Sequence, residues 1–158
     1  MTTNEEMTLI AKNKGKKKAS KRKRKSRYKT GFHYSPKCKN DKGIFEYRSG
    51  WEETFSFDLD SDSSVLEYEY ETIKIPYILN NKTGKIRYYI PDFIVTYKDG
   101  RKVIYEIKNT SAAKNIMVVK KAKAAELWAQ RNGYQYKMLL GDVISQLEKK
   151  QKALKQKI

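Results

Sequence analysis

The sequence predicts an α/β fold in which a mixed central sheet is flanked by helices. One stretch, residues 86–108, is dense in Ile, Val, Tyr and Phe and reads as two strands joined by a tight turn. Other segments place apolar residues at helical spacing instead. The expected order is helix, three strands, helix, strand, helix, and such a chain packs as a sheet with helices on both faces. A length of 158 residues suits one domain of this kind.

Residues 1–30 are expected to stand apart from this domain, which then comprises residues 31–158. Twelve Lys or Arg less Glu5 and Glu6 give the segment +10 of the formal net charge of +17. Like charges at this density repel, so we expect a disordered arm. The arm suits a solvating tail, a nuclear-localisation signal or a DNA-binding segment without sequence choice, and we favour the last. Its expected DNA contacts are Lys21, Arg22, Lys23, Arg24 and Lys25.

The charge balance of the whole chain favours a polyanionic partner, with nucleic acid ahead of an anionic membrane. Lys and Arg number 35 against 18 Asp and Glu. No apolar run approaches the length of a membrane span, and the first residues do not resemble a signal peptide, so no membrane partner is expected. Cys38 is the only cysteine, which excludes a disulfide framework and a cysteine-based zinc cluster and suits a reducing cytosol.

A first helix is expected to begin near Ser49. Residues 31–47, which precede it, hold Gly, Pro and Asn breakers and read as a loop. Ser49 and Glu52 have the spacing of a capping box, with Ser49 as the N-cap. An apolar stripe follows at four-residue spacing: Trp51, Phe55 and Leu59. The Asp and Ser residues between 58 and 63 are expected to end the helix.

Residues 65–77 read as a strand with a bulge near Glu71, because the alternation of side chains switches phase there. Glu67, Glu69 and Glu71 are expected on a solvated face away from DNA. Residues 80–84 form a turn into the next strand.

The 86–108 stretch follows as a hairpin. Its first strand spans residues 86–96 and contains Pro91, so it should bend or lose pairing there. Asp99-Gly100 supplies the tight turn, and residues 102–107 form the return strand.

This hairpin gathers three ionisable residues. Side chains alternate along a strand, so Glu106 and Lys108 project from one face while Ile107 points to the other. The hairpin then brings Asp92 beside that pair. Two carboxylates and an ammonium at a strand end suit a hard divalent cation next to a phosphate. The alternative is an exposed hairpin with scattered charges.

Residues 114–132 are predicted to form a basic helix, which ends at Gly133. Ile116, Val119 and Leu127 share one face of it. Lys123 falls on the same face with Lys120 beside it, and each either extends to solvent or reaches a phosphate near the site. A last strand over residues 134–140 and a final amphipathic helix, capped by Asp142, complete the chain. The apolar side of that helix is Ile144, Leu147, Leu154 and Ile158.

Pro91-Asp92, followed after thirteen residues by Glu106-Ile107-Lys108, resembles the PD-(D/E)xK signature of the restriction-endonuclease-like nucleases. The similarity extends to residues 47–52, 75–77 and 87–95 in that order. Over about residues 32–140 the chain resembles the head completion endonucleases of large tailed bacteriophages. The nuclease subunit of heteromeric transposases is similar in the same core and is the near competitor.

The resemblance implies a restriction-endonuclease-like core and a Mg²⁺ site, in which Mn²⁺ can substitute. Asp92, Glu106 and the Ile107 carbonyl would be ligands, and Lys108 would orient the attacking water. Many such nucleases carry an acid on the first core helix, which favours Glu52 as a ligand, directly or through water. Spacing alone favours Glu52 as a capping residue only. Glu53 points about 100° further round the helix, away from the apolar stripe.

The implied function is hydrolysis of phosphodiester bonds at DNA ends of filled phage heads before tail joining. The implied setting is the host cytoplasm or the virion, with head or portal proteins as partners and a monomer or a homodimer. A transposase-type or structure-selective nuclease, a non-catalytic basic DNA-binding virion or nucleoid protein and a ribosomal-type RNA binder remain alternatives. The expected phosphate contacts in the domain are Arg48, Arg87, Lys114, Lys120 and Lys123.

Overall fold

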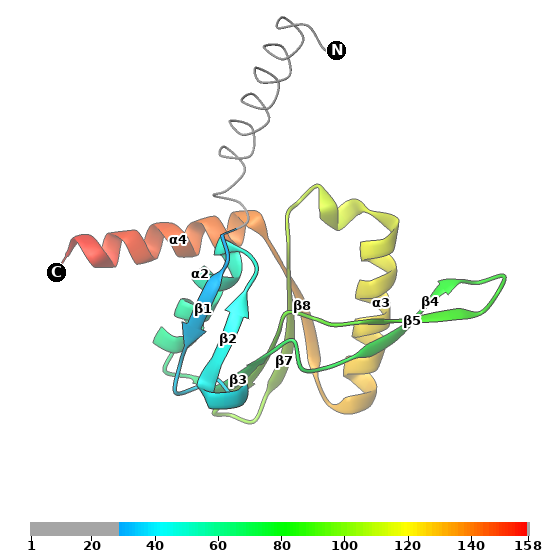
Figure 1. Ribbon diagram of the computed structural model, residues 1–158, viewed down its shortest axis with the longest axis horizontal. Helices are drawn as coiled ribbons and strands as arrows, with labels where there is room; N and C mark the ends of the chain where they lie inside the picture. The colour runs from blue at the N-terminus through cyan, green and yellow to red at the C-terminus, as the bar shows by residue number, and fades with distance from the viewer. Residues whose placement is uncertain (1–28, 158) are drawn as a thin grey trace, which may run out of the picture.

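The structure, a computed structural model that describes residues 29–157, has a four-stranded sheet at its centre (Figure 1). The strand order is β3–β6–β7–β8. The sequence-predicted arm up to residue 28, with its expected DNA contacts at residues 21–25, lies outside the described residues. The strands are β3 (Val65–Tyr70), β6 (Phe93–Tyr97), β7 (Lys102–Lys108) and β8 (Gln135–Leu140). The first three pair antiparallel and β8 runs parallel to β7, so the sheet is mixed as predicted.

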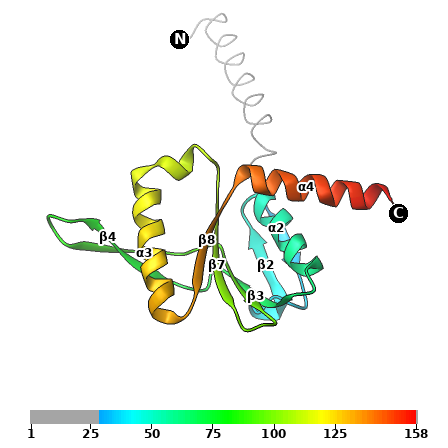
Figure 2. The same cartoon turned by 180° about the vertical axis from the view of Figure 1, so that it is seen from behind.

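Helices cover both faces of this sheet, α3 on one and α2 with α4 on the other (Figures 1 and 2). The helices are α2 (Gly50–Ser61), α3 (Ile116–Asn132) and α4 (Gly141–Gln156), and a short 3₁₀ turn, η2 (Ala112–Lys114), precedes α3. The order α2, β3, β6, β7, α3, β8, α4 is the predicted one, which confirms the restriction-endonuclease-like core. None of the helices described is both long enough and apolar enough to cross a membrane.

Residues 31–47, predicted as a loop, instead form a hairpin. β1 (Gly31–Tyr34) pairs antiparallel with β2 (Ile44–Tyr47), and the 3₁₀ turn η1 (Asp41–Gly43) leads into β2. Gly43 has φ +71°, and a Cβ there would lie 2.9 Å from the Ser35 carbonyl oxygen, so the turn requires glycine. The breakers in the sequence mark this turn and not the absence of strands.

A second hairpin interrupts the sheet where the sequence predicted two long strands. β3 ends at Tyr70, and β4 (Ile75–Asn80) pairs only with β5 (Lys85–Tyr89). Glu71 adopts a left-handed φ of +52°, and its N–H donates to the Asp92 carbonyl oxygen at 3.0 Å. The hairpin segment, residues 72–91, therefore leaves the four-stranded sheet and returns to it at the same place. The bulge of β3 lies between Val65 and Glu67, not at Glu71. The predicted break at Pro91 is confirmed, because it separates β5 from β6.

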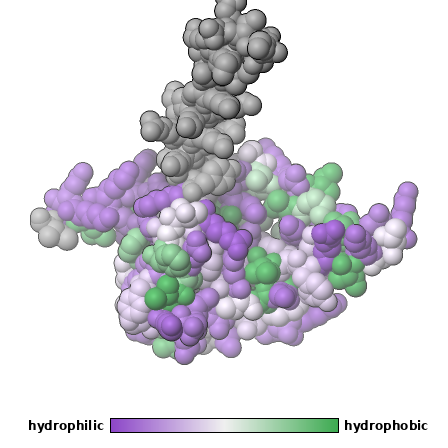
Figure 3. Space-filling model, viewed as in Figure 1, coloured by the Kyte–Doolittle hydropathy of each residue, from purple (hydrophilic) through white to green (hydrophobic). Residues whose placement is uncertain are grey.

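The predicted apolar stripe of α3 is wrong. Ile116, Val119 and Leu127 are 74%, 43% and 55% exposed, while Ala125 and Ala129 are buried against the sheet. Hydrophobic side chains accordingly gather on the surface near the start of α3 and over the β4–β5 hairpin (Figure 3). Small residues allow the helix backbone to approach the strands closely, and this contact outweighs the burial of the larger residues.

The ends of the other helices follow the sequence in part. Ser49 and Glu52 form the predicted capping box at the start of α2. The helix continues to Ser61, so Asp58 and Asp60 lie inside it and do not end it. Asp142 does not cap α4, which begins at Gly141 with Leu140 at the N-cap position and Asp142 in its first turn.

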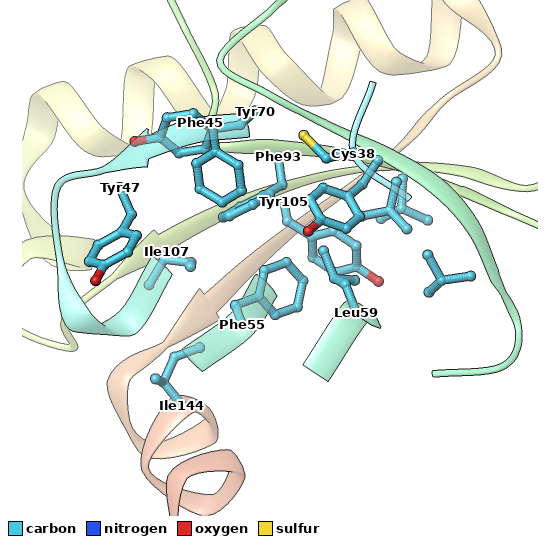
Figure 4. Close-up of a cluster of buried hydrophobic side chains, with 14 residues drawn as sticks. Cys38, Phe45, Tyr47, Phe55, Leu59, Tyr70, Phe93, Tyr105, Ile107 and Ile144 are labelled. Carbon is cyan, nitrogen blue, oxygen red and sulfur yellow. The ribbon is translucent and has the colours of Figure 1, made fainter. Parts of the chain in front are cut away.

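Aromatic rings fill the core on the α2 side of the sheet (Figure 4). The Phe45 and Tyr70 rings stack with centroids 4.4 Å apart, and Phe55 meets Phe93 edge to face at 5.2 Å. Ile144 of α4 is fully buried in the same cluster. This packing holds α2 against the strands and fixes the position of its first turn relative to the end of β7.

Candidate active site

Asp92 and Glu106 meet where β6 begins and β7 ends. Asp92 directly precedes β6, and its Oδ2 accepts a hydrogen bond of 2.8 Å from the Ile107 N–H. Phe93 pairs with Tyr105 in the ladder, so the next residues outward on the two strands are Asp92 and Glu106. The antiparallel register therefore brings the two carboxylates together, as the sequence predicted.

Two neighbouring side chains contact the Glu106 carboxylate. Its Oε2 accepts a hydrogen bond of 2.5 Å from the Tyr89 hydroxyl, and its Oε1 lies 3.2 Å from the Lys108 Nζ. Ile107 points into the opposite core, as alternation requires. Burial raises the pKa of the Glu106 carboxyl, although Tyr89 and Lys108 favour its charged form. Lys108 is therefore placed beside a carboxylate while more than a third of its side chain still meets solvent.

Glu52 faces the same site from the first turn of α2. Its Oε2 accepts hydrogen bonds from the Arg48 N–H at 2.6 Å, the Ser49 N–H at 3.3 Å and the Tyr70 hydroxyl at 3.1 Å. Within the described residues all three go to Oε2, so Oε1 stays available to the pocket. Burial raises the pKa of the Glu52 carboxyl, and the hydrogen bonds oppose this shift. Glu52 is thus both the capping residue and a lining residue of the site.

Glu53 lies elsewhere. Its carboxylate pairs with Lys29 at 2.9 Å, and it lines a separate surface hollow between α2 and α4. Burial opposes ionisation, but the neighbouring Tyr47 and Lys29 outweigh it and lower the pKa of Glu53. The helical periodicity therefore predicted correctly that Glu52, and not Glu53, lies at the pocket.

A pocket of about 340 Å³ brings Asp92, Lys108 and Glu52 to one surface, and Glu106 lines a smaller adjoining cavity. The larger pocket is lined by Arg48, Ser49, Trp51, Glu52, Asp92, Ile107, Lys108, Asn109 and Ala112. Burial first, and then the Glu106 and Glu52 carboxylates, raise the pKa of Asp92 well above its ordinary range. A bound cation would relieve this repulsion between the carboxylates.

The donor set suits a hard cation only with further ligands. Among residues 29–157, no three Asp, Glu, His or Cys side chains converge closely enough to hold a metal by themselves. Asp92 and Glu106 provide two carboxylates, and Ile107 contributes to the lining of the pocket. Mg²⁺ keeps several waters and typically takes one or two protein carboxylates, so this set fits it.

The expected phosphate contacts differ in their distance from the pocket. Arg48 lines it and pairs with Glu71 at 3.1 Å, so Glu71 lies beside the site and not on a remote face. Arg87 is on the exposed β5 strand, and Lys114 is in η2. Lys120 is on α3, and Lys123 lines a separate hollow with Val119 and Met138.

Sequence reasoning missed two groups that flank Glu106. Tyr89 donates to its carboxylate, and Lys121 lines a small adjoining cavity with Tyr89, Glu106 and Lys108. The Lys121 Nζ lies 5.9 Å from the centroid of the Tyr89 ring. The signal for Lys121 was its place four residues before Ala125, on the stripe of α3 that is buried.

Two comparisons with known proteins agree with this geometry. A model of the TnsA-like endonuclease N-terminal family matches residues 62–140, which is half of the chain. The head completion nuclease of Enterobacteria phage T4 is 29% identical over 128 residues, and the match covers 67% of this chain and 85% of that protein. Asp92, Glu106 and Lys108 all lie within the range that the family matches.

The mixed sheet and the paired carboxylates at the ends of its two inner strands agree with the two comparisons, and together they define a nuclease of the restriction-endonuclease-like class. Glu52 enters the site from outside the range that the family matches, through the capping box of α2. The chain belongs to the TnsA-like endonuclease N-terminal family.

Glu52→Gln should separate the two roles of this residue. The amide oxygen still accepts from the Arg48 N–H and the Tyr70 hydroxyl, so the melting temperature should not fall below the native value. Loss of the negative charge should lower the cleavage rate by orders of magnitude if Glu52 serves the reaction. Glu52→Ala should lose activity and also about 1–3 kcal/mol of stability, because buried donors are left unsatisfied.

The measurement pairs thermal unfolding with single-turnover cleavage. Glu53→Gln is the matched control on the same turn and should leave the rate unchanged. A Glu52→Gln protein with native cleavage would reduce Glu52 to a capping residue.

Proposed function

We propose that this endonuclease hydrolyses phosphodiester bonds of DNA with a bound divalent cation. The observation that carries the proposal is the meeting of Asp92, Glu106 and Lys108 at the end of one sheet, opposite Glu52. A protein that only binds DNA gains nothing from clustered carboxylates in a basic chain, because they repel phosphates.

Asp92 and Glu106 would hold Mg²⁺, or Mn²⁺ in its place, with the Ile107 carbonyl as a further ligand and Glu52 as a direct or water-mediated one. When bound there, the ion would lower the pKa of a water and neutralise negative charge on the phosphate. The desolvation and mutual repulsion that raise the pKa of Asp92 support this assignment, since attraction to a bound cation would offset both.

The side chains around the ion have separable tasks. Lys108 would orient the attacking water and donate to the negative charge that develops on the phosphate. Tyr89 would fix the Glu106 carboxylate by its hydrogen bond, and the Ile107 N–H would fix Asp92. Arg48, at the rim of the pocket, would hold a flanking phosphate in exchange for its pair with Glu71.

DNA is the substrate that the charge of the chain favours. The formal net charge is +17, and the contacts proposed in the domain lie at Arg48, Arg87, Lys114, Lys120 and Lys123. These side chains would hold phosphates and position the duplex without reading bases.

The similarity to the phage T4 head completion nuclease supports a role in head completion, and we propose that the cleavage takes place at DNA ends of filled heads before tail joining. Head or portal proteins would then be partners, and the protein would act in the host cytoplasm or on the virion. The family description favours a second candidate, cleavage at transposon ends as part of a heteromeric transposase. Linear, branched and end-blocked DNA substrates would separate these two settings.

A plasmid-nicking assay tests the proposal directly. The full-length protein should nick supercoiled DNA in Mg²⁺ or Mn²⁺ and should stop when the metal is chelated. Nicking that continues in chelator, or no nicking in either metal, would refute metal-dependent cleavage.

Removal of residues 1–30 should weaken DNA binding and flatten its salt dependence. About ten net positive charges leave with the segment, and each phosphate contact adds roughly 0.9 to the log–log salt slope for duplex DNA. Cleavage at saturating DNA should continue, because no proposed ligand lies in the segment. Binding isotherms at several salt concentrations measure the slope, and an unchanged slope would show that the arm does not contact DNA.

A further inference from the structure

The β4–β5 hairpin has one covered face and one open face. On the covered face, Tyr77 and Tyr89 pack with the buried side of α3. On the open face, the ladder pairs Ile78 with Ile86 and Pro76 with Tyr88. The exposed fraction is 53% for Ile78, 58% for Ile86 and 67% for Tyr88. The hairpin projects beyond α3 (Figure 1). Hydrophobic side chains lie among hydrophilic ones on the surface over the hairpin (Figure 3).

The charge of the hairpin indicates what kind of partner can bind to its open face. Residues 72–91 contain no Asp or Glu and carry Lys74, Lys82, Lys85 and Arg87. A second copy of the chain would bring the same basic ribbon and a net charge of +17 against it, so repulsion opposes self-association. A polyanion with accessible apolar surface fits both properties. DNA has such a surface wherever the flat face of a base pair is exposed.

The hairpin is also continuous with the active site. Tyr89, next to Tyr88, donates its hydroxyl to Glu106 at 2.5 Å. Asp92 follows Tyr88 by four residues, which at roughly 3.3 Å per residue keeps the two within about 13 Å along the chain. This span equals about four steps along one DNA strand at roughly 3.4 Å each. DNA held at the carboxylates is thus within reach of Tyr88.

We propose that the open face of the β4–β5 hairpin, with Tyr88 at its centre, stacks on an exposed base-pair face at a duplex end or branch and so selects the DNA that the active site cuts. This inference rests on the proposed function. Aromatic and aliphatic side chains stack on or wedge between bases, while Lys82 in the exposed turn meets an adjoining phosphate. The interior of a continuous duplex presents no such face.

The double substitution Ile86→Thr with Tyr88→Ser tests the wedge in the full-length protein. Binding is measured in Ca²⁺ to a blunt-ended duplex, to a branched duplex and to a dumbbell of equal length whose ends are closed by loops. The native protein should prefer the open and branched DNA over the dumbbell by about tenfold or more, the range expected for loss of a base–aromatic stack. The variant should lose this preference and keep native affinity for the dumbbell.

Three further variants serve as controls. Tyr88→Phe keeps the ring and should keep the preference. Ile116→Thr alters an equally exposed apolar residue on α3 and should change nothing. Lys82→Gln with Lys85→Gln should weaken binding to all three DNAs by similar factors, since phosphate contacts do not discriminate between them. Thermal unfolding checks that each variant is folded.

A 2-aminopurine at the terminal base pair reports stacking independently of affinity. Its fluorescence should change when the native protein or the Tyr88→Phe variant binds and should stay constant with the double variant. Equal affinity of the native protein for open and closed DNA, or a preference that survives in the double variant, would overturn the wedge. Dissociation of a native dimer by the double substitution would overturn it too, because the face would then be an interface between copies.

The binding experiments test the wedge, and the cleavage assay tests the proposed function separately. Native protein that cleaves in Mg²⁺ but shows no preference would remove the wedge and leave the nuclease assignment standing. A protein without cleavage that still shows the Tyr88-dependent preference would remove the hydrolysis and support the wedge as a binding element.

Discussion

Asp92→Asn and Glu106→Gln are each expected to abolish cleavage in Mg²⁺ while DNA binding is retained. An amide keeps the shape of the side chain but removes the charge that holds a hard cation. The amide oxygen that the first substitution introduces can still accept from the Ile107 N–H, so the strand ends should remain in register. Plasmid nicking and binding in Ca²⁺ measure the two properties. Retained nicking by either variant would refute the metal-site assignment.

The same substitutions should raise the melting temperature of the metal-free protein at pH 7. Burial and the Glu106 carboxylate raise the folded-state pKa of Asp92 above its ordinary value of 3.8. A raised folded-state pKa means that the contribution to stability is fully present below the unfolded-state pKa and is lost as the pH rises through the folded-state pKa. The native protein therefore carries a penalty at pH 7 that the amide removes. The gain should disappear near pH 3.

Thermal unfolding in chelator at the two pH values measures this gain. Asp99→Asn is the matched control, because Asp99 is exposed in the β6–β7 turn and should give no gain at pH 7. A metal-free Asp92→Asn protein that melts below the native one at pH 7 would contradict the repulsion inferred at the site.

Lys108→Ala should leave DNA affinity nearly unchanged and lower the single-turnover cleavage rate by about 10²–10³-fold. Lys108 is one of 35 Lys and Arg, so its loss scarcely alters the field that attracts DNA. Its Nζ lies 3.2 Å from the Glu106 Oε1, beside the proposed metal site at which the phosphate would gain charge in the transition state. Loss of rate without loss of binding marks an interaction made mainly in the transition state.

Lys108→Arg should restore little activity, because the wide guanidinium does not replace a compact ammonium at a crowded site. Lys98→Ala, at the exposed turn, is the control and should cleave normally. If the rate lost by Lys108→Ala is matched by lost affinity, Lys108 is an ordinary phosphate contact.

The core of the fold was predictable because its signals are local. The capping box at Ser49 and Glu52 fixes the start of α2, and Asp99-Gly100 fixes the turn between β6 and β7. The β4–β5 hairpin was not predictable in the same way. Strand-forming Val, Ile and Tyr residues occur on both sides of Glu71, and only the left-handed Glu71 shows where one strand ends.

The positions of site residues could be predicted where they follow from the pairing of β6 with β7. They could not be predicted where they depend on how α3 packs against the sheet. Asp92, Glu106 and Lys108 follow from a single hairpin register. Tyr89 and Lys121 do not, because their positions require the buried face of α3 to be known. The fully buried residues of that face are Ala125 and Ala129, whereas a count of large apolar residues favours the stripe through Ile116.

The hydrogen bond from Glu71 to Asp92 has a consequence for how such a protein can diversify. It closes residues 72–91 into an excursion whose two ends meet, and the partners β3 and β6 stay adjacent whatever lies between them. The tip beyond Ile78 and Ile86 can therefore lengthen, shorten or change composition at little cost to the sheet. Tyr89, at the base, still ties each such change to Glu106. The selection of DNA that we propose for the hairpin could then change between related proteins while the active site stays the same.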